Sequence, residues 1–237
     1  MSVIKKNAPG SSELLMGNEA IARGALEAGI QFAAAYPGNP SSEIIGSLSE
    51  VAEEMGIYVE WSVNEKVALE AATSASFSGL RALSAMKQNG VNVASDFILN
   101  LNLSGVGTGG LVLVAADDPG AISSTNEEDS RFIAKLGDLS LLEPATFQEA
   151  KDMTRWAFEL SEAINSLVVL RSVSRISHAR GNVILGELPR EKRTARYDTS
   201  KIFIPVSAPL RHLALHMKLN KVREMYEVDA DTLLMVA

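Results

Sequence analysis

Ala35-Tyr36-Pro37-Gly38-Asn39-Pro40-Ser41-Ser42-Glu43 separates a mostly apolar run at residues 30–34 from residues 44–56, whose apolar side chains recur at helical spacing. The sequence therefore predicts a strand that turns directly into a helix. In an α/β sheet, turns at the carboxyl ends of strands are the usual place for a ligand site. We expect the chain to be arranged so that it presents this turn.

The two prolines and the residues beside them define the expected shape of the turn. Asn39 is a residue type that commonly caps a helix, and Pro40 is favoured in the first helical position. With that cap, the hydroxyl and N–H groups of Ser41 and Ser42 are expected to face outward at the positive end of the helix dipole. The turn is thus suited to an anion.

The rest of the chain alternates between short apolar runs and segments with helical periodicity. Residues 111–116 are apolar on both faces, which is typical of a central parallel strand. Residues 1–16 are expected to be a short lead-in. We expect strands at 31–35, 57–61, 81–86, 111–116, 140–144 and 166–172, and helices at 19–28, 44–55, 65–78, 91–103, 127–135 and 147–164. This alternation predicts an α/β fold with a doubly wound, mostly parallel sheet and helices on both faces.

The composition changes near residue 186, after which a polar and basic segment reads as a linker. We therefore expect one domain over residues 1–186, followed by a linker and a C-terminal helical extension over residues 187–237. Within the extension we predict an edge strand at 201–206 and an amphipathic helix at 209–226.

Composition excludes several classes of function. The 237 residues are 46% hydrophobic and carry a net charge of −7, which is ordinary for a globular protein and offers no basic surface to nucleic acid. There is no cysteine, so this chain holds no disulfide, thiolate nucleophile or cysteine-ligated cluster. No run approaches the roughly 18 apolar residues of a membrane helix, and no signal peptide is evident. We expect a cytoplasmic protein without a nucleic-acid or membrane partner.

Two further patterns have ordinary explanations. Residues 105–110 contain four glycines but follow a predicted helix and precede a strand, the reverse of a dinucleotide-binding loop, so a mobile connector is expected. His212 and His216 have a spacing that can bind zinc, yet Leu213 stands where a metalloprotease has glutamate. A surface or interface pair is the preferred interpretation, and no metal ligand is predicted.

Glu65 has two interpretations from the residues alone. Asn64 is expected to cap the helix at 65–78, whose inner face is formed by small side chains, namely Val67, Ala68, Ala71, Ala72 and Ala75. A glutamate in a first helical turn is favoured by the helix dipole without any further role, which is the simpler interpretation. The same position, just after a strand ending at Trp61, also brings its carboxyl to the edge where the turn at residues 35–43 lies.

Five segments together resemble the 2-oxoacid:ferredoxin oxidoreductase family, and within it the α subunit of indolepyruvate oxidoreductase. The resemblance covers about residues 14–180, with the segments in order and at compatible spacing. They are Met16-Gly17-Asn18-Glu19-Ala20-Ile21-Ala22-Arg23-Gly24, Tyr36-Pro37-Gly38-Asn39-Pro40-Ser41-Ser42-Glu43-Ile44, Glu60-Trp61-Ser62-Val63-Asn64-Glu65-Lys66-Val67-Ala68, Met86-Lys87-Gln88 and Ala116-Asp117-Asp118-Pro119-Gly120.

This resemblance implies the pyrimidine-binding domain of a thiamine diphosphate enzyme. Glu65 matches the family's glutamate, which hydrogen-bonds N1′ of the aminopyrimidine and so activates the cofactor. We expect burial behind Trp61, Val63 and Val67 to shield Glu65 once the site is closed. The implied reaction is oxidative decarboxylation of a 2-oxoacid, with indolepyruvate or another arylpyruvate as the expected substrate, to an acyl-CoA.

The resemblance also assigns binding residues. Implied cofactor contacts besides Glu65 are Lys87, Gln88 and Asn89. The segment near the substrate's carboxylate is matched by Tyr36, Pro37, Gly38, Asn39, Pro40 and Ser41. Asn39 departs from the family, which usually has threonine there; it still offers a hydrogen-bond donor and adds bulk.

The family's Gly-Asp-Gly motif for Mg²⁺ and its cysteine-rich cluster motif do not occur in this sequence. The resemblance therefore implies that Mg²⁺, the diphosphate and the iron–sulfur clusters are held by a partner domain or subunit. It further implies coenzyme A as cosubstrate, a γ-type subunit, ferredoxin, and a homo- or hetero-oligomer. Two alternatives stay open: a non-catalytic ligand-binding or assembly subunit, and half of another thiamine enzyme, such as a decarboxylase or a transketolase-like protein.

Overall fold

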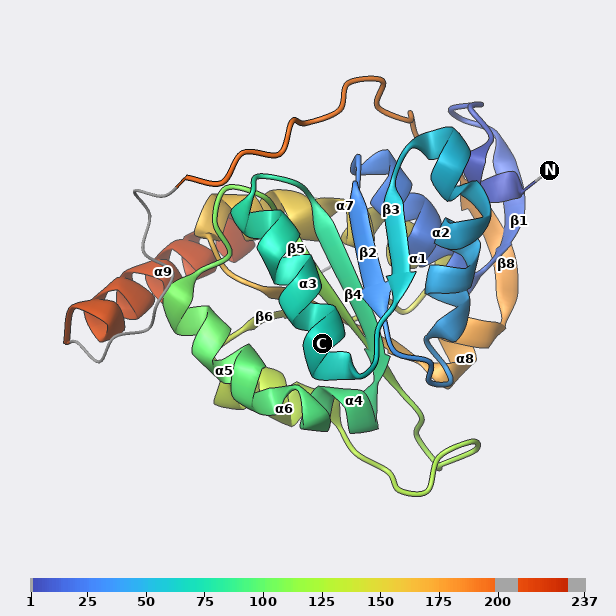
Figure 1. Ribbon diagram of the computed structural model, residues 1–237. Helices are drawn as coiled ribbons and strands as arrows, with labels where there is room; N and C mark the ends of the chain where they lie inside the picture. Colours follow the sequence, from blue (N-terminus) through green and yellow to red (C-terminus); the bar gives the residue numbers. More distant parts are fainter. Residues whose placement is uncertain (1, 199–208, 230–237) are drawn as a thin grey trace.

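Six parallel strands form the central sheet, in the order β3-β2-β4-β5-β7-β6 (Figure 1). The computed structural model describes residues 2–198 and 209–229. The strands are β2 (Phe32–Ala35), β3 (Tyr58–Trp61), β4 (Ala82–Lys87), β5 (Leu111–Asp117), β6 (Ser140–Leu142) and β7 (Val168–Val173). The chain order reverses beside β4, so the sheet is doubly wound, as the sequence predicts.

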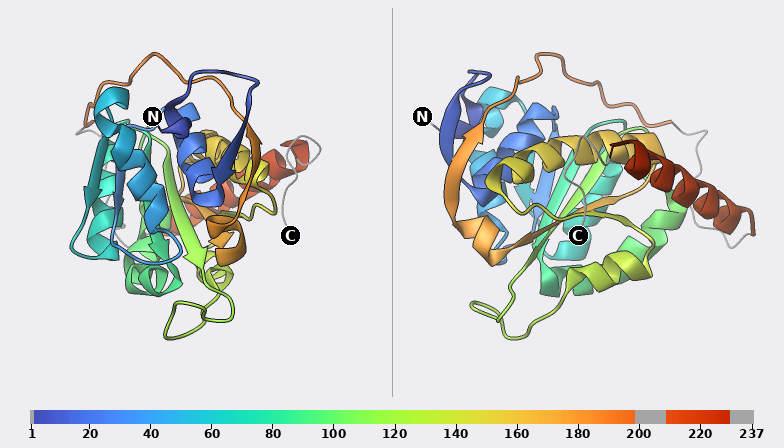
Figure 2. Two further views of the ribbon diagram at one scale, coloured as in Figure 1. Left: turned by 90° about the vertical axis from the view of Figure 1, so that its right-hand side faces the viewer. Right: turned by 180° about the vertical axis from the view of Figure 1, so that it is seen from behind.

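Helices cover both faces of this sheet (Figure 2). One face packs against α1 (Gly17–Glu27), α2 (Ser42–Met55) and α7 (Phe147–Ile164), and the other against α3 (Glu65–Phe77), α4 (Gln88–Val93), α5 (Ser95–Ser104) and α6 (Ser130–Leu136). All seven residues of β5 are buried, and Val112 and Val114 join one core while Leu111 and Leu113 join the other. The predicted α/β fold class is confirmed.

A second, two-stranded sheet was not expected from the sequence. β1 (Ser12–Met16) pairs antiparallel with β8 (Arg180–Ile184), so the interpretation of residues 1–16 as a mere lead-in is wrong. Each strand buries only one hydrophobic side chain, Leu15 or Val183. The pairing joins residues more than 160 positions apart and is therefore set by tertiary packing rather than by a local pattern.

Several element boundaries also differ from the predictions. The helix expected at 91–103 begins earlier and divides at Ala94 into α4 and α5, and α6 begins at Ser130 rather than 127. The buried face of α3 comprises Ala68, Leu69, Ala72, Thr73 and Ser76, so the expected inner face is rotated about the helix axis. Ala-rich patterns do not distinguish these faces well, since alanine tolerates both environments.

The glycine-containing connector at residues 105–110 is held in place, contrary to the expected mobility. Ser76 Oγ lies 2.7 Å from the carbonyl oxygens of both Val106 and Gly109, and its single proton can be donated to either of them. Asn165 Oδ1 accepts from the N–H groups of Val106 and Gly107. The connector is therefore fixed at the amino end of the sheet.

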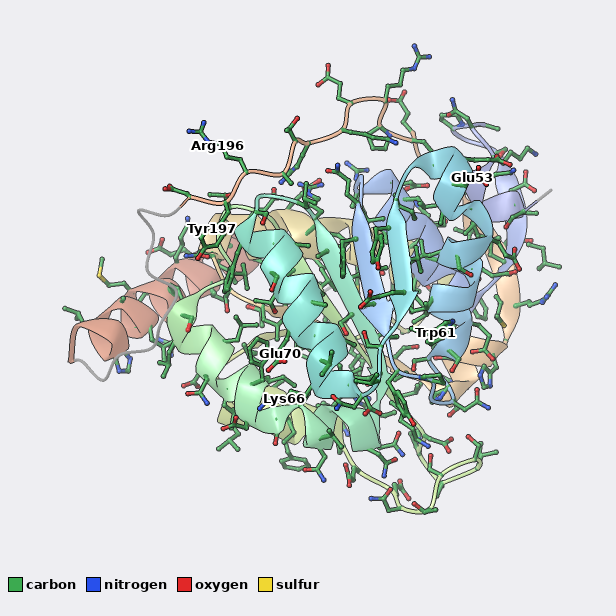
Figure 3. The ribbon with its side chains drawn as sticks, in the orientation of Figure 1. Glu53, Trp61, Lys66, Glu70, Arg196 and Tyr197 are labelled. Atoms are coloured by element: carbon green, nitrogen blue, oxygen red, sulfur yellow. The ribbon has the colours of Figure 1, made fainter. Side chains whose placement is uncertain are left out.

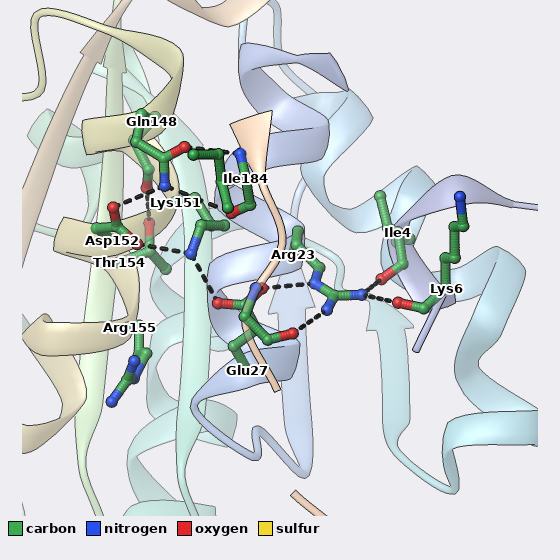
Figure 4. A network of polar contacts seen from close by, with 12 residues as sticks. Ile4, Lys6, Arg23, Glu27, Gln148, Lys151, Asp152, Thr154, Arg155 and Ile184 are labelled. Carbon is green, nitrogen blue, oxygen red and sulfur yellow. Dashed lines mark hydrogen bonds and ion pairs between the residues drawn. The ribbon is translucent and has the colours of Figure 1, made fainter. Parts of the chain in front are cut away.

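Buried charges connect α1 to α7 (Figure 4). Arg23 donates to Glu27 at 2.7 Å and to the carbonyl oxygens of Ile4, Lys6 and Gly186. Lys151 donates to the other carboxyl oxygen of Glu27 at 2.8 Å. Gly24 makes the close approach possible, because a Cβ there would lie 2.2 Å from the carbonyl oxygen of Lys151. The network also anchors the residues on either side of the small sheet.

The short helix α8 (Ser174–His178) connects β7 to β8. After β8 the chain continues as an extended segment. Residues 187–198, the strap, cross the amino end of the sheet: Gln31 and Arg193 exchange two hydrogen bonds, and Arg193 pairs with Glu162 at 2.6 Å. The predicted C-terminal helix is α9 (Pro209–Asp229), whereas the predicted edge strand at 201–206 lies outside the described residues. His216 is exposed, and the side chain of His212 is not among those described.

Within residues 2–198 and 209–229, no helix has both the length and the apolar character that crossing a membrane requires. Those residues also contain no group of three or more metal-ligating side chains placed to hold an ion.

Candidate functional site

The carboxyl ends of β2, β3, β4 and β5 lie at one edge of the sheet and carry the residues that the sequence singles out (Figure 1). The turn after β2 contains residues 36–41, Glu65 follows β3, and Lys87 ends β4. A long loop, residues 118–129, leaves β5 and projects beyond this edge. Because parallel strands all end here, side chains that are distant in sequence come together.

The turn after β2 is closed on the carbonyl oxygen of Gly38. That oxygen accepts hydrogen bonds from Ser41 N–H at 2.9 Å, Ser41 Oγ at 2.8 Å and Ser42 N–H at 3.1 Å. Ser42 Oγ in turn accepts from Gly38 N–H at 2.9 Å. The predicted capping by Asn39 is wrong, since α2 begins at Ser42 and the serine side chains satisfy the turn internally.

The six residues predicted to line the substrate fall into two groups. Tyr36, Pro37 and Asn39 are exposed, whereas Pro40 and Ser41 are buried and support the turn from within. The expectation that Ser41 faces outward is therefore wrong: its hydroxyl is used to close the turn. Of the six residues, only Tyr36, Pro37, Asn39 and the half-buried Gly38 are open to solvent.

Glu65 lies against Gly90 in α4, the short helix that follows β4. Asn64 caps α3 as predicted, with its Oδ1 accepting from Val67 N–H at 2.9 Å, and this sets Glu65 as the first helical residue. A Cβ built on Gly90 would lie 2.4 Å from Glu65 Cγ and 2.7 Å from Oε1. Only glycine at position 90 leaves room for this carboxyl, so the two residues form one constellation.

Lys87 joins the same constellation to the turn after β2. A Cβ on Gly38 would lie 3.1 Å from Lys87 Cδ, so the aliphatic stem of Lys87 packs directly on the turn. Lys87 thus connects the predicted substrate residues with Gln88 and Asn89, the predicted cofactor residues that follow it at the start of α4.

Gln88 and Asn89 each have one buried oxygen atom with no hydrogen-bond partner among the described residues, Gln88 Oε1 and Asn89 Oδ1. Their amide nitrogens are engaged by Asn126 of the long loop, through its carbonyl oxygen and its Oδ1 respectively. Buried polar atoms are nearly always paired in folded proteins, so these two unpaired acceptors are candidate contacts for a ligand that donates hydrogen bonds. An aminopyrimidine ring carries such a donor.

Apolar side chains near Glu65 are open to solvent. Trp61, at the end of β3 (Figure 3), is 46% exposed, and Val63 and Val67 are 79% and 37% exposed. This chain by itself therefore leaves Glu65 half-buried rather than shielded by these three side chains. Large exposed apolar groups beside a ligand edge are typical of a surface that another domain covers.

Asp117 and Asp118 at the end of β5 have anchoring roles. Asp117 accepts from Arg171 Nε at 2.6 Å and from Ser130 at the start of α6. Asp118 accepts from Ser123 N–H, Ser124 Oγ and Ser174 Oγ. Burial alone would raise the pKa of Asp118, but the hydrogen bonds led by Ser174 outweigh it and bring the pKa down to about 2. Both carboxylates position the loop and are not free for a ligand.

Sequence reasoning missed Asn126, and no local pattern could have found it. It lies in an irregular loop, 37 residues after Asn89, and its partners are known only once β4 and β5 are adjacent.

The fold defines the class: a doubly wound α/β domain that carries a glutamate, two amide side chains and a tightly closed turn at the carboxyl edge of its sheet. The family model described as "Pyruvate flavodoxin/ferredoxin oxidoreductase, thiamine diP-bdg" matches residues 23–214. The chain belongs to this family, and the predicted resemblance to 2-oxoacid:ferredoxin oxidoreductases is confirmed.

Curated relatives agree with this assignment. The chain is 50% identical to the indolepyruvate oxidoreductase subunit IorA of Thermococcus kodakarensis over 91% of this chain and 34% of the relative. Identity to IorA of Archaeoglobus fulgidus is 43%, over 94% of this chain and 37% of that protein. Identity to the 2-oxoglutarate synthase subunit KorA of Methanocaldococcus jannaschii is 27%, over 73% and 49% respectively. This chain spans about a third of the length of the IorA relatives.

A solved structure has the same fold. It is the 2-oxoglutarate:ferredoxin oxidoreductase of Magnetococcus marinus, with 2-oxoglutarate, coenzyme A and succinyl-CoA bound. The TM-score is 0.74 over 92% of this chain and 45% of that one, at 17% sequence identity. At that identity, the likeness concerns the fold alone.

Proposed function

We propose that this chain forms the pyrimidine-binding part of a thiamine diphosphate-dependent 2-oxoacid:ferredoxin oxidoreductase. The division into a domain at 1–186 and an extension at 187–237 belongs to this proposal, as does a cytoplasmic location. Bound thiamine diphosphate supplies the nucleophilic carbon that decarboxylation of a 2-oxoacid needs.

One observation carries the proposal: Glu65 is held against Gly90 of α4, the helix that begins with two amides whose buried oxygens have no hydrogen-bond partner among the described residues. A carboxyl that faces a ring nitrogen and acceptors that face an amino group are the complement of an aminopyrimidine. The chemistry of these groups therefore fits the ring. The residues that would hold it are Glu65, Lys87, Gln88 and Asn89.

Within this arrangement, the chain's own groups have separate tasks. Glu65 Oε1 would hold or share a proton with the ring nitrogen, and the absence of a side chain at Gly90 leaves room for that carboxyl. Tyr36 and Asn39 are exposed and offer hydroxyl and amide donors to a substrate carboxylate. Trp61 and Val63 offer an apolar surface that excludes water once a partner covers it.

An arylpyruvate, indolepyruvate in particular, is the proposed substrate, and oxidative decarboxylation to an acyl-CoA is the proposed reaction. Relatives named for indolepyruvate are 43 to 55% identical, against 27 to 28% for those named for 2-oxoglutarate. The diphosphate, Mg²⁺ and iron–sulfur clusters are assigned to a partner domain or subunit. A γ-type subunit, ferredoxin and coenzyme A complete the proposed system.

The test is Glu65→Ala in the full complex with thiamine diphosphate. Loss of a positioned acid or base costs about a hundredfold or more, so oxoacid-dependent reduction of the electron acceptor should fall at least that far. Gly90→Ala should produce a comparable loss, because the added methyl group occupies the space of the Glu65 carboxyl.

Gly46→Ala provides a matched control, since its Cβ meets nothing within 4 Å and the site is untouched. Intact oxoacid-dependent activity in Glu65→Ala would refute the proposed role. If the chain purifies without a partner bearing a Gly-Asp-Gly motif and clustered cysteines, the alternative of a non-catalytic binding or assembly subunit is favoured.

A further inference from the structure

Asn126 contacts both free-acceptor amides from the long loop after β5. Its carbonyl oxygen accepts from Gln88 Nε2 at 3.3 Å, and its Oδ1 accepts from Asn89 Nδ2 at 2.5 Å. Its own Nδ2 donates to Glu128 Oε1 at 2.6 Å. A single exposed residue therefore connects two proposed cofactor contacts to a carboxylate that lies outside the site.

The direction of these hydrogen bonds is fixed at their outer end. A carboxylate only accepts hydrogen bonds, so Glu128 requires the amide nitrogen of Asn126 and thereby turns the Asn126 oxygen toward Asn89. Asn89 must then donate, which leaves Asn89 Oδ1 as the free acceptor. A backbone carbonyl also only accepts, so Gln88 must direct its nitrogen at Asn126 and leave Oε1 free.

The loop that carries Asn126 is itself anchored. Asp118, at the end of β5, accepts from Ser123 N–H at 2.8 Å and from Ser124 Oγ at 2.9 Å, and also from Ser174 Oγ of α8 at 2.6 Å. These bonds fix the near side of the loop only two to three residues before Asn126. The position of Asn126 relative to β4 is thus built into the fold.

We propose that Asn126 is a positioning residue for cofactor binding: it holds Gln88 and Asn89 so that both their oxygens accept hydrogen bonds from the ligand. This inference rests on the proposed function and extends it to a residue outside the ligand contacts. The amino group of an aminopyrimidine donates, whereas a 2-oxoacid carboxylate only accepts and is repelled by amide oxygens. The two oxygens therefore select the cofactor ring rather than the substrate.

The experiment titrates thiamine diphosphate into the cofactor-depleted intact complex and measures the dissociation constant by calorimetry. Asn126→Ala removes the bond that orients Asn89, so we expect binding to weaken about five- to tenfold, the effect of roughly one hydrogen bond. Thr125→Ala, at the neighbouring exposed position, is the matched control and should bind as wild type does. Unchanged affinity in Asn126→Ala would overturn the inference.

A polarity-conserving pair separates positioning from mere loop stability. In N126D/E128Q, the amide now at position 128 donates to the carboxylate at position 126, which still accepts from Asn89. We expect affinity within about twofold of wild type, because the orientation of Asn89 is retained. Failure of this pair to recover the affinity lost in Asn126→Ala would show that orientation is not the cause.

A double-mutant cycle with Asn89→Ala distinguishes a failure of the inference about Asn126 from a failure of the proposed function. If Asn126 acts through Asn89, the double variant N89A/N126A binds no more weakly than N89A alone. Full additivity would overturn the inference while leaving the proposed function intact. If neither Glu65→Ala nor Asn89→Ala alters thiamine diphosphate affinity, the proposed function itself fails.

Discussion

Two regions of this protein, one between α1 and α7 and one at the carboxyl end of the sheet, differ in how their buried polar side chains are paired. Between the helices, each nitrogen of the Arg23 guanidinium donates a hydrogen bond, and both oxygens of Glu27 accept from Arg23, Lys151 or Gly186 (Figure 4). At the sheet end, Gln88 and Asn89 each retain a free acceptor. The paired groups hold the fold, whereas the unpaired acceptors are the ones that the proposed cofactor would use.

The largest loss of stability is expected when a charge is removed from the network between α1 and α7. Glu27→Ala would leave the guanidinium of Arg23, which is fully buried, without a carboxylate, and breaking a buried pair costs about 3 to 5 kcal/mol. We expect the free energy of unfolding, measured by urea titration, to fall by that amount. An effect below about 1 kcal/mol would mean that the network contributes little. Glu53→Ala, on α2, serves as a charge-matched control.

The next largest loss of stability is expected from a substitution that disturbs the close approach of α1 and α7. Gly24→Ala places a methyl group 2.2 Å from the carbonyl oxygen of Lys151 and 2.9 Å from Thr154 Cβ, and overpacking of this kind costs about 1 to 3 kcal/mol. Gly46→Ala, inside α2 with open space around its Cβ, should instead raise stability by about 0.5 to 1 kcal/mol. Thermal unfolding of both variants checks the contrast, and equal shifts would contradict it.

Asp118 lies between the two kinds of region, because it is fully hydrogen-bonded yet supports the ligand loop. Its pKa in the folded protein, about 2, is below the ordinary value of 3.8, so its stabilisation is complete above about pH 4 and is lost as pH falls toward 2. Asp118→Asn should cost about 1 to 2 kcal/mol at pH 7, with a difference from wild type that shrinks between pH 4 and 2.

Urea unfolding at several pH values measures this difference. Asp138→Asn is the control, since Asp138 is exposed and its positive φ of 50° suits asparagine. A pH-independent cost for Asp118→Asn would show that the low pKa is not the source of the stabilisation.

The smallest effect on stability is expected at the ligand edge. Gln88→Met keeps the shape of the side chain and removes an unpaired buried oxygen together with the long 3.3 Å hydrogen bond to the exposed Asn126, so the free energy of unfolding should change by less than about 1 kcal/mol. The same variant should weaken thiamine diphosphate binding in the full complex. A clear loss of stability would assign Gln88 to the fold rather than to the site.

Much of the fold could be predicted, because the deciding patterns are local. The apolar run of β5 and the cap at Asn64 each depend on neighbours a few residues away. The pairing of β1 with β8 could not be predicted, since a strand with one buried side chain has too little pattern to indicate a partner. The proposed cap at Asn39 failed because two serines competed successfully for the same turn.

The sequence by itself determined the α/β class, the positions of most strands and helices, and, by its resemblance to a family, the residues worth examining at the strand ends. Only the tertiary structure decided how those residues meet: Glu65 on Gly90, Lys87 on Gly38, and Asn126 on both amides. The physical reason is that secondary structure follows from local periodicity, whereas a site depends on contacts between strands that the chain order alone does not make adjacent.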